Sequence, residues 1–418
     1  MTEKILSVKA GREVHAGEIA ICRVDRVLGT DASSPMAIDY FEKMGGERLF
    51  DPSRVLFSFD HYSPPASPKT AAFHERVRAF AKKYGAEVCE VGEGIGFQLL
   101  AERGGALPGS LVIGADSHTV TAGALNLFAT GVGSSDLAAA MITGQVWLRV
   151  PASIKVTLTG TRTAYLSAKD VALALVKAIG PDGANYSALE FHGSALPAFT
   201  LEERMVICNL GVEMDAKASI FPSDGATHEY LSGRKVGLDA PVTADTRAVY
   251  AREVTLDLSK LSPRVALPHA PDNVVPIEQA VGTPVQMVFL GTCTGGRVRD
   301  FHEALKALNR AGGSVAEGVQ LVVTPASREV AEALREDGTL ARFEELGAIV
   351  TTVGCGACCG TSGVIPADGM NVLSTANRNF KARMGNATAS IYLASPAACG
   401  ASAATGKITD PRRERAAR

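Results

Sequence analysis

The stretch VQMVFLGTCTGGR, residues 285–297, decides the fold class, because it joins a buried strand to a reactive loop. Its first six residues form an apolar run of the length typical of a buried strand, and Cys293 follows in a glycine-rich loop. A second apolar run, AIVTTV (residues 348–353), leads to Cys355 and Cys358 in the segment GCGAC. In open α/β sheets, ligand sites form beyond the carboxyl ends of the strands. The pattern therefore indicates an α/β protein with its chemistry at strand exits.

The three cysteines point to a metal centre. Cys355 and Cys358 form a Cys-x2-Cys pair that can share one metal, and Cys293 can join them only if the fold returns it to the same place. Four-iron clusters normally take four thiolates. With three, one iron has no protein ligand and stays open to water or a substrate oxygen, as in a Lewis-acid catalyst. Buried thiols and a zinc site completed by a histidine are the alternatives from the cysteines alone.

Three further strand-like runs end in polar side chains. They are VLFSF (residues 55–59) before Asp60-His61, LVIGA (111–115) before Asp116-Ser117-His118, and NVLST (371–375) before Asn377, Arg378 and Arg383. Imidazoles and carboxylates suit proton transfer, and planar guanidinium groups suit substrate carboxylates. Thiols, acid–base groups and arginines are thus all expected at the same kind of position in the fold.

These motifs resemble the aconitase superfamily. The matching segments, which run in the family's order, are FDHYSPP, GADSHTVTAGALNLFATGVGSSD, CNLGVEMDAKASIFP, FLGTCTGGR, GCGAC and STANRNFKARMG. The match runs from about Asp25 to about Ala404, and the length of 418 residues resembles the separate large subunit of 3-isopropylmalate dehydratase and homoaconitase rather than one-chain aconitase. The resemblance implies three tandem α/β/α-type domains around a central cluster site. Pro151 and the Pro-rich residues 261–276 place the boundaries, which gives 1–150, 151–265 and 266–418.

The resemblance also implies a role for each candidate residue. A [4Fe-4S] cluster would be held by Cys293, Cys355 and Cys358, with one open iron. The implied catalytic residues are Asp60, His61, Asp116, Ser117, His118 and Glu213, with His61 giving the proton that leaves with the substrate hydroxyl and Asp60 tuning it. The implied substrate-side residues are Asn209, Asn377, Arg378 and Arg383. Asn209 and Glu213 are four residues apart in a helix expected to begin near Thr200, so we expect them to share a face.

The implied reaction is dehydration or isomerisation of a 2-hydroxy di- or tricarboxylic acid by a hydro-lyase of the 3-isopropylmalate dehydratase type. Homoaconitase, 2,3-dimethylmalate dehydratase and maleate hydratase are the alternatives within that class. A clusterless, iron-dependent RNA-binding regulator and a zinc-bound scaffold are the alternatives outside it. The chain has no Gly-Ser-Ser-Arg segment of the kind that supplies the carbon base and further arginines in one-chain aconitases. A separate small subunit, the swivel domain, is therefore expected to supply them.

Composition agrees with a carboxylic-acid enzyme. The 42 basic and 44 acidic residues nearly balance, which gives no indication of a nucleic-acid partner. No stretch reaches the ~18 uninterrupted apolar residues of a membrane span. The start, MTEKILSVKAG, lacks the apolar centre of a secretory signal, and thiol ligands favour a reducing compartment. A cytoplasmic protein with no membrane partner is expected.

Two residues depart from the family pattern. The segment GIGFQ has Phe97 where the family usually has histidine, and CTGG has Gly295 in place of asparagine. An aromatic ring near Asp116 adds apolar surface, so an alkylated malate such as 3-isopropylmalate is expected over citrate or homocitrate.

Three local predictions can also be read from the sequence. Residues 137–150 are expected to be helical, and Ser167 and Asp170 to form a capping box with Gly180 closing the helix. Cys359 is expected to point away from the cluster.

Overall fold

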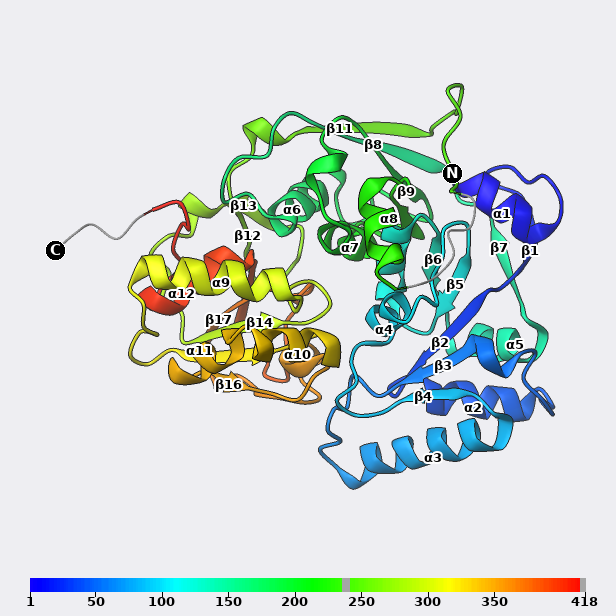
Figure 1. Cartoon of the computed structure of the whole chain (residues 1–418), viewed down its shortest axis with the longest axis horizontal. Coiled ribbons are helices and arrows are strands. Elements are labelled where there is room, and N and C mark those ends of the chain that lie inside the picture. Colours follow the sequence, from blue (N-terminus) through cyan, green and yellow to red (C-terminus); the bar gives the residue numbers. More distant parts are fainter. Residues whose placement is uncertain (235–240, 414–418) are drawn as a thin grey trace.

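The computed structural model describes residues 1–234 and 241–413 and contains three large sheets, one after another along the chain (Figure 1). The first has five strands in the order β4-β3-β2-β5-β6, and all its neighbours pair in parallel. Its strands are short and mostly buried, as parallel strands covered on both faces require. Their bounds are β2 Arg26–Thr30, β3 Val55–Ser58, β4 Glu87–Cys89, β5 Leu111–Gly114 and β6 Phe128–Gly131.

The second sheet has four parallel strands in the order β10-β9-β8-β11. It comprises β8 Ser153–Thr159, β9 Ala188–His192, β10 Ala218–Ile220 and β11 Arg252–Asp257. A separate antiparallel pair, β1 Ile19–Arg23 with β7 Gln145–Arg149, lies beside the first sheet.

The third sheet has seven strands in the order β13-β12-β18-β17-β14-β15-β16. The five strands from β18 to β16 are parallel, and β12 and β13 add antiparallel at the β18 edge. The bounds are β12 Arg264–Ala266, β13 Val274–Pro276, β14 Met287–Gly291, β15 Gln320–Thr324, β16 Ile349–Val350, β17 Asn371–Ser374 and β18 Ser390–Ala394.

The first and third sheets share one connectivity. In the first, β2 lies between β3 and β5, and in the third, β14 lies between β15 and β17. The order of successive strands reverses at these positions, and ligands bind in the crevice beyond the carboxyl ends of strands at such a switch point. The fold therefore offers two crevices of the same kind.

Helices join the strands and cover the sheets (Figure 1). Their bounds are α1 Thr2–Ala10, α2 Ser34–Lys43, α3 Pro68–Tyr84, α4 Gly96–Glu102, α5 Ser134–Thr143, α6 Ala168–Ile179, α7 Leu201–Asn209, α8 Gly225–Ser232, α9 Val298–Ala311, α10 Arg328–Glu336, α11 Thr339–Glu345 and α12 Pro396–Thr405. Three 3-10 helices carry site residues, namely η2 Ser117–Leu125, η4 Leu210–Met214 and η7 Gly356–Cys359.

Two local predictions differ in outcome. The capping box at the start of α6 is confirmed, since Ser167 accepts from the Asp170 N–H and Gly180 follows the last turn. The prediction of a helix over 137–150 is wrong beyond Thr143. Gly144 ends α5 with a left-handed φ of 70°, and the next residues form β7 because they can pair with β1.

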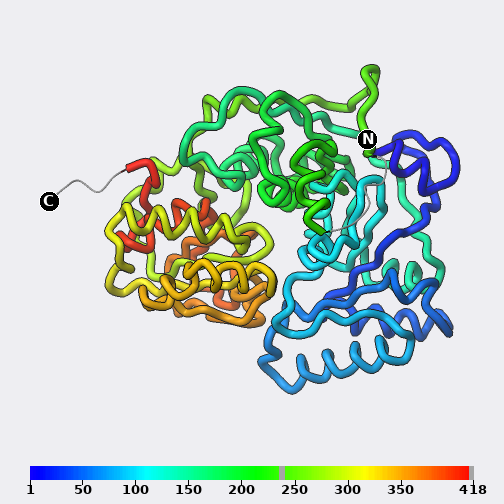
Figure 2. The backbone as a smooth tube through the Cα atoms, in the orientation of Figure 1, coloured from blue at the N-terminus to red at the C-terminus, as the bar shows by residue number. Residues whose placement is uncertain are grey.

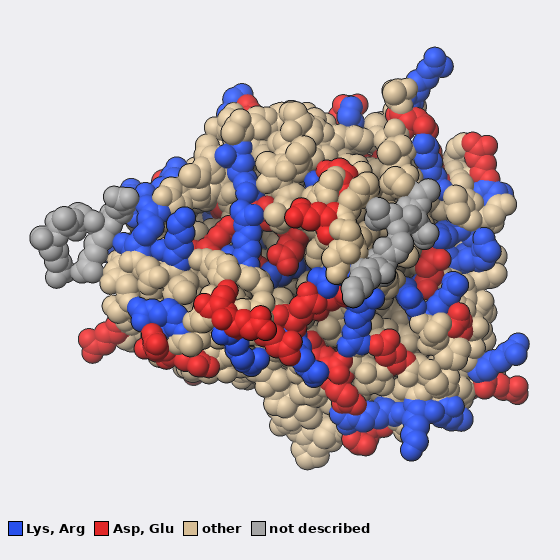
Figure 3. All heavy atoms as spheres, in the orientation of Figure 1, with Lys and Arg blue, Asp and Glu red and all other residues tan. Residues whose placement is uncertain are grey.

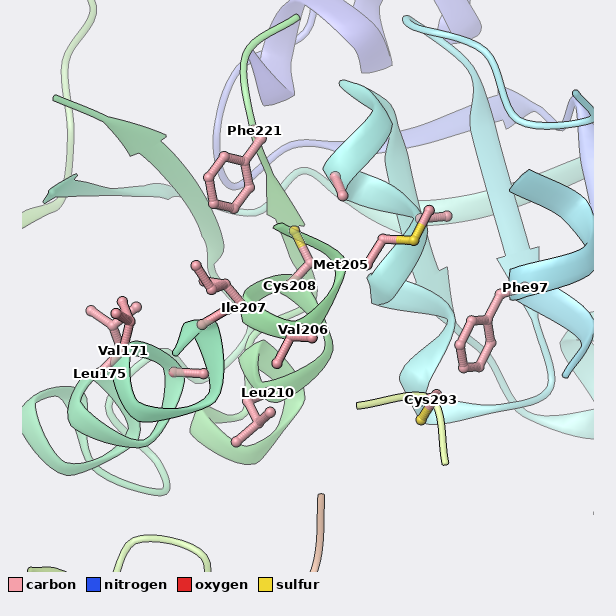
Figure 4. Packing of buried hydrophobic residues seen from close by; sticks show 14 of the residues in the cluster. Phe97, Val171, Leu175, Met205, Val206, Ile207, Cys208, Leu210, Phe221 and Cys293 are labelled. Carbon is pink, nitrogen blue, oxygen red and sulfur yellow. The ribbon is translucent and has the colours of Figure 1, made fainter. Parts of the chain in front are cut away.

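One apolar cluster runs through all three sheets and reaches the switch-point region, where it includes Phe97 and Cys293 (Figure 4). The tube in Figure 2 shows the three sheet regions as successive blue–cyan, green and yellow–red parts. The domain boundaries at 150 and 265 stay a prediction, since membership of a sheet does not by itself define a unit that folds alone. Within the described ranges, no helix combines the length and apolar character needed to cross a membrane.

Candidate active site

The exit of β3 presents a histidine held by a buried carboxylate. Asp60 Oδ1 lies 2.7 Å from His61 Nδ1, and Asp60 Oδ2 accepts from the Ser58 hydroxyl at 3.0 Å and the Gly96 N–H at 2.8 Å. A carboxylate only accepts, so Nδ1 carries the proton of this bond. The other ring nitrogen, Nε2, faces the cavity. Burial alone would lower the pKa of His61, but the Asp60 charge and hydrogen bond raise it well above its usual range. The Asp60 carboxylate therefore favours the protonated form of His61.

The exit of β5 continues this chain of titratable groups. Asp116 Oδ2 lies 3.6 Å from His61 Nε2, and its Oδ1 accepts the His118 N–H at 2.7 Å as the N-cap of η2. Burial would raise the pKa of Asp116, but the His118 hydrogen bond and the two histidine charges bring it well below its usual range. Asp116 is thus an anion that faces both histidines.

His118 extends the chain toward another element. Its Nε2 lies 3.0 Å from Glu213 Oε1, which also accepts from Arg378 Nε at 2.7 Å. Burial would raise the pKa of Glu213, and the His118 hydrogen bond and charge, together with Arg378, lower it. Glu213 belongs to η4 rather than α7, because α7 ends at Asn209 and the chain tightens there into a 3-10 turn. The prediction that Asn209 and Glu213 share one helix is therefore wrong, although both are buried near the site.

The third sheet brings the three cysteines to the same place. Cys293 follows β14, and Cys355 and Cys358 follow β16, with Cys358 inside η7. The Cys355 N–H donates to the Asp60 carbonyl at 2.9 Å, so the cysteine loop is tied directly to the exit of β3. The fold does return Cys293 to Cys355 and Cys358, and all three line one small cavity of about 30 Å³ that opens to solvent. Its lining comprises His61, Ile95, Phe97, Asp116, His118, Thr292, Cys293, Cys355, Cys358, Cys359, Asn377 and Arg383.

Nitrogen donors are directed at the sulfurs. Asn209 Nδ2 donates to Cys293 Sγ at 3.1 Å, and Asn377 Nδ2 does so at 3.3 Å. The two amides also bond each other, since Asn377 Nδ2 donates to Asn209 Oδ1 at 3.1 Å. Arg383 Nη2 donates to Cys358 Sγ at 3.6 Å. Such N–H···S contacts stabilise thiolate charge in iron–sulfur sites.

The donor set suits an iron–sulfur cluster. Burial raises the pKa of Cys293 to about 12 and also raises the pKa values of Cys355 and Cys358, so the thiols ionise only when a metal takes the proton's place. Among the described residues, Cys359 is the one further cysteine that lines the cavity beside these three. A mononuclear zinc remains a geometric alternative, since ligand atoms of Asp60, His61 and Cys355 lie within 4.8 Å of one another in the described chain.

Not every predicted residue lines the cysteine cavity. Ser117 lies instead in a neighbouring hollow that it shares with Asp116. Asn209, Glu213 and Arg378 act from behind the lining, through Cys293 and His118. Arg383 lines the cavity directly, and its buried Nε–H has no hydrogen-bond partner among the described residues.

Cys359 differs from its prediction. It lines the rim of the cavity, and its Sγ lies 2.7 Å from the Thr361 hydroxyl, which itself donates to the His61 carbonyl at 2.7 Å. Because Thr361 uses its proton on that carbonyl, the Cys359 thiol is the donor to Thr361. The thiol therefore has Thr361 as its partner, and the place of Cys359 in the lining is what differs from the prediction.

The two departures from the family pattern have a structural setting. Phe97 is 3% exposed and lines the cavity together with Asp116, and Figure 4 shows its ring beside Cys293. A Cβ at Gly295 would lie 2.2 Å from Thr375 Cβ, so no side chain fits there while Thr375 keeps its place. Thr375 is fixed because its hydroxyl accepts the Gly291 N–H at 3.0 Å.

Two buried cations that support the site were missed from the sequence. Lys169 Nζ donates to the Thr375 and Ala376 carbonyls at 2.9 and 2.5 Å, just before Asn377, and burial lowers its pKa to about 8. Arg297 donates to the Cys293 carbonyl at 2.9 Å. A lysine in the first turn of an apolar helix opposes the helix dipole. This unfavourable position is the sequence feature that could have indicated a buried role for Lys169.

Comparison with known proteins matches this geometry. The Aconitase family (aconitate hydratase) matches residues 3–284 and 279–406. The 3-isopropylmalate dehydratase large subunit 1 of Methanopyrus kandleri is 43% identical over 413 residues, 99% of this chain and 98% of that protein. The protein of the same name from Thermotoga maritima is 44% identical over 418 residues, 99% of each chain.

A solved structure shares the fold. The crystal structure of Thermococcus kodakaraensis aconitase X (holo-form) superposes with a TM-score of 0.50 at 13% identity, over 86% of this chain and 84% of that one. The family implies an iron–sulfur cluster, which agrees with the thiol-lined cavity. The α/β fold, the cavity and the near full-length matches lead to one conclusion: the chain belongs to the aconitase family.

Proposed function

We propose that this chain is the cluster-bearing large subunit of a hydro-lyase that dehydrates and isomerises a 2-hydroxy dicarboxylic acid, with 3-isopropylmalate as the preferred substrate. The observation that carries the proposal is one cavity lined by the three candidate ligand thiols and Cys359, a carboxylate-held histidine and an arginine with an unused donor. Relatives that match nearly the whole chain bear the name 3-isopropylmalate dehydratase large subunit.

The proposed cofactor is a [4Fe-4S] cluster on Cys293, Cys355 and Cys358. Support comes from the three amide and guanidinium donors on two of these sulfurs. When bound, such a cluster supplies Lewis acidity at the iron that lacks a protein thiolate. No redox change is needed in a dehydration, so the remaining chemistry is proton transfer and charge stabilisation.

His61 is the proposed acid that delivers a proton to the departing hydroxyl. Its Nε2 faces the cavity, while the Asp60 carboxylate behind Nδ1 raises the pKa of His61 and favours the protonated ring. Asp116, 3.6 Å from Nε2, aligns the ring and balances its charge. Ser117 lies in the neighbouring hollow, so its proposed catalytic role is indirect, through the adjacent Asp116.

The groups behind His61 form a proposed second path. His118, Glu213 and Arg378 are connected by hydrogen bonds of 3.0 and 2.7 Å. We assign these three residues to orienting, through His118, the water that forms from the substrate hydroxyl and a proton and the water that adds back at the neighbouring carbon. Glu213 stays ionised for that role because His118 and Arg378 both lower its pKa.

Arginines are the proposed holders of the substrate carboxylates, and two amides support the substrate site from the Cys293 side. Arg383 has one nitrogen on Cys358 and a second, Nε, without a partner, so its fork is available for a substrate carboxylate. Arg378 offers a second cation at the same strand exit. Asn209 and Asn377 position the Cys293 end of the site and leave the carboxylates to the arginines.

A small subunit is the proposed partner. The described cavity provides an acid but no serine or lysine to act as the carbon base. The name "large subunit" carried by the relatives agrees with a partner that completes the site. We therefore expect the isolated chain to be inactive and the mixture of both subunits to be active.

Phe97 supports the substrate assignment. The ring offers an apolar wall beside Asp116, and burial of one methylene of an alkyl substituent contributes about 0.8 kcal/mol. A purely polar tricarboxylate gains nothing from that wall. An isopropyl or methyl group on the malate skeleton is thus the substituent that this cavity suits.

The test is a substrate panel with the anaerobically reconstituted complex of both subunits. We expect 3-isopropylmalate or an alkylated malate to have the highest kcat/KM, and citrate and homocitrate to be poor. Turnover by the chain alone, free of any partner, would contradict the small-subunit assignment. A preparation that contains about one zinc per chain, and no iron or sulfide after reconstitution, would contradict the cluster assignment.

A further inference from the structure

Asp31, at the exit of β2, is a fully buried carboxylate behind His61. Its Oδ1 accepts the backbone N–H of His61 at 3.1 Å, and its Oδ2 accepts the backbone N–H of Tyr62 at 2.8 Å. Oδ1 also lies 3.7 Å from His61 Nδ1. Asp31 thus fixes the peptide segment that carries the histidine, while Asp60 fixes the ring.

His74, on α3, orients Asp31 from the other side. Its Nε2 lies 3.0 Å from Asp31 Oδ2, and a carboxylate only accepts, so Nε2 carries the proton of this bond. The imidazole is 1% exposed and stacks on Phe59 with a centroid distance of 4.1 Å and an interplanar angle of 6°. Arg78 lies over the Phe59 ring at 5.0 Å. The ring of His74 therefore has one available orientation.

Packing alone does not account for this pair. An apolar pair of similar volume fills a core at least as well as a buried carboxylate and imidazole, whose desolvation is costly. Here every polar contact of the Asp31 side chain leads to the His61–Tyr62 segment or to His74. The arrangement has the form of a histidine supported by outer partners that fix its direction.

We propose that Asp31 and His74 are a positioning pair that holds the His61 imidazole toward the cavity. The inference rests on the proposed function, in which His61 delivers the proton to the substrate hydroxyl. Neither Asp31 nor His74 lines the cavity itself, and Asp31 bonds the lining residue His61, so both act through His61. Their role is to orient His61, the proposed acid, and not to bind substrate.

Two substitutions of His74 separate positioning from packing. His74→Phe keeps a ring to stack on Phe59 but removes the donor to Asp31, whereas His74→Gln keeps a donor and loses the ring. In the reconstituted complex, we expect His74→Phe to lower kcat about tenfold or more with KM nearly unchanged, and His74→Gln to stay within about threefold of wild type. Hydrogen exchange of the backbone amides in residues 59–65 should be faster in the Phe variant alone.

The matched control is the His302–Asp337 pair, whose 2.6 Å bond lies on the surface. His302→Phe should change neither kcat nor exchange in residues 59–65. If His74→Phe does not fold, Asp31→Asn replaces it in the test. We expect the same loss of kcat, because the amide NH2 of asparagine would face N–H donors where Asp31 has an accepting oxygen.

Three results would overturn the inference: the opposite order of the two His74 variants, wild-type kcat in Asp31→Asn, or unaltered exchange in the impaired variant. If the wild-type complex turns over none of the hydroxy acids, the proposed function fails. Exchange in residues 59–65 still decides the positioning in that case.

Discussion

The first and third sheets have the same connectivity but deliver different chemistry to one cavity. The exits of β2, β3 and β5 carry carboxylates and histidines, whereas the exits of β14, β16 and β17 carry thiols, amides and arginines. A switch point thus fixes where side chains converge and leaves their type open. One backbone arrangement, used twice, thus separates proton-transfer groups from metal- and anion-binding groups.

The two halves are nevertheless tied together through backbone groups. The Cys355 N–H donates to the Asp60 carbonyl, and the Thr361 hydroxyl donates to the His61 carbonyl. The second sheet contributes no strand exit to the lining and acts through α7 and η4 instead. Substitutions in the first sheet should therefore impair turnover with the cluster kept, and substitutions at the third should remove the cluster or weaken substrate binding.

The largest effect is expected for Cys358→Ser, on the third-sheet side. Loss of one of three thiolates should abolish the cluster, because two thiolates cannot hold four irons. Iron and sulfide content and visible absorbance after anaerobic reconstitution measure this, and activity should vanish with them. Wild-type iron and sulfide content in this variant would contradict the assignment of cluster binding to the third sheet and proton transfer to the first.

Asp60→Asn, on the first-sheet side, should keep the cluster and lose turnover. We expect kcat to fall by about 10²- to 10⁴-fold, the range for loss of general acid–base catalysis. The Asp60 charge raises the pKa of His61, so its removal lets the imidazole lose its proton at a lower pH. The alkaline limb of the pH–kcat profile should therefore move to lower pH. An unmoved limb with normal cluster content would show that His61 is not the acid.

Arg383→Lys should leave the cluster in place and raise KM. Lysine keeps the charge but loses the fork, including the Nε–H that has no partner in the described chain. A charge-assisted hydrogen bond contributes about 1.5–3 kcal/mol, so KM should rise about ten- to a hundredfold. Steady-state kinetics on the complex measure it. A loss confined to kcat would place Arg383 on the proton-transfer side instead.

Phe97→His should reduce the ratio of kcat/KM for alkylated substrates to kcat/KM for citrate. Each methylene that no longer packs on the ring costs about 0.8 kcal/mol, or about fourfold in kcat/KM. The measurement is the ratio of kcat/KM for 3-isopropylmalate to that for citrate, in both proteins. If citrate or homocitrate is already the best wild-type substrate, the assignment based on Phe97 is wrong.

The smallest effect is expected for Cys359→Ser, the matched control for Cys358→Ser. A serine hydroxyl can donate to Thr361 as the thiol does, so cluster content and activity should stay near wild type. Loss of iron in this variant would identify Cys359 as a ligand and would remove the open iron from the proposal.

Much of the fold could be predicted from the sequence, because strands and helix caps depend on patterns a few residues long. The apolar runs before Asp60, Asp116 and Asn377 each contain the observed strand, the run before Cys293 covers all of β14 but Gly291, and the capping box of α6 forms as predicted. The run 348–353 yields only the two-residue β16. The end of α5 at Gly144 and the break between Asn209 and Glu213 were not readable, since strand pairing and tight turns there depend on distant partners.

The α/β class, the strand exits and the residue types near them follow from the order of residues, because hydrophobic periodicity and short motifs act over a few residues. Which of these groups meet depends on how the sheets and helices pack. Glu213 bonds Arg378 across 165 residues, Lys169 reaches Thr375 across 206, and Asp31 joins His74 across 43. His74 shares the buried face of α3 with Val77 and Ala81, which indicated burial but not a partner. Such contacts depend on where two sheets and a helix pack, and the partner of a buried polar group is fixed only by that packing.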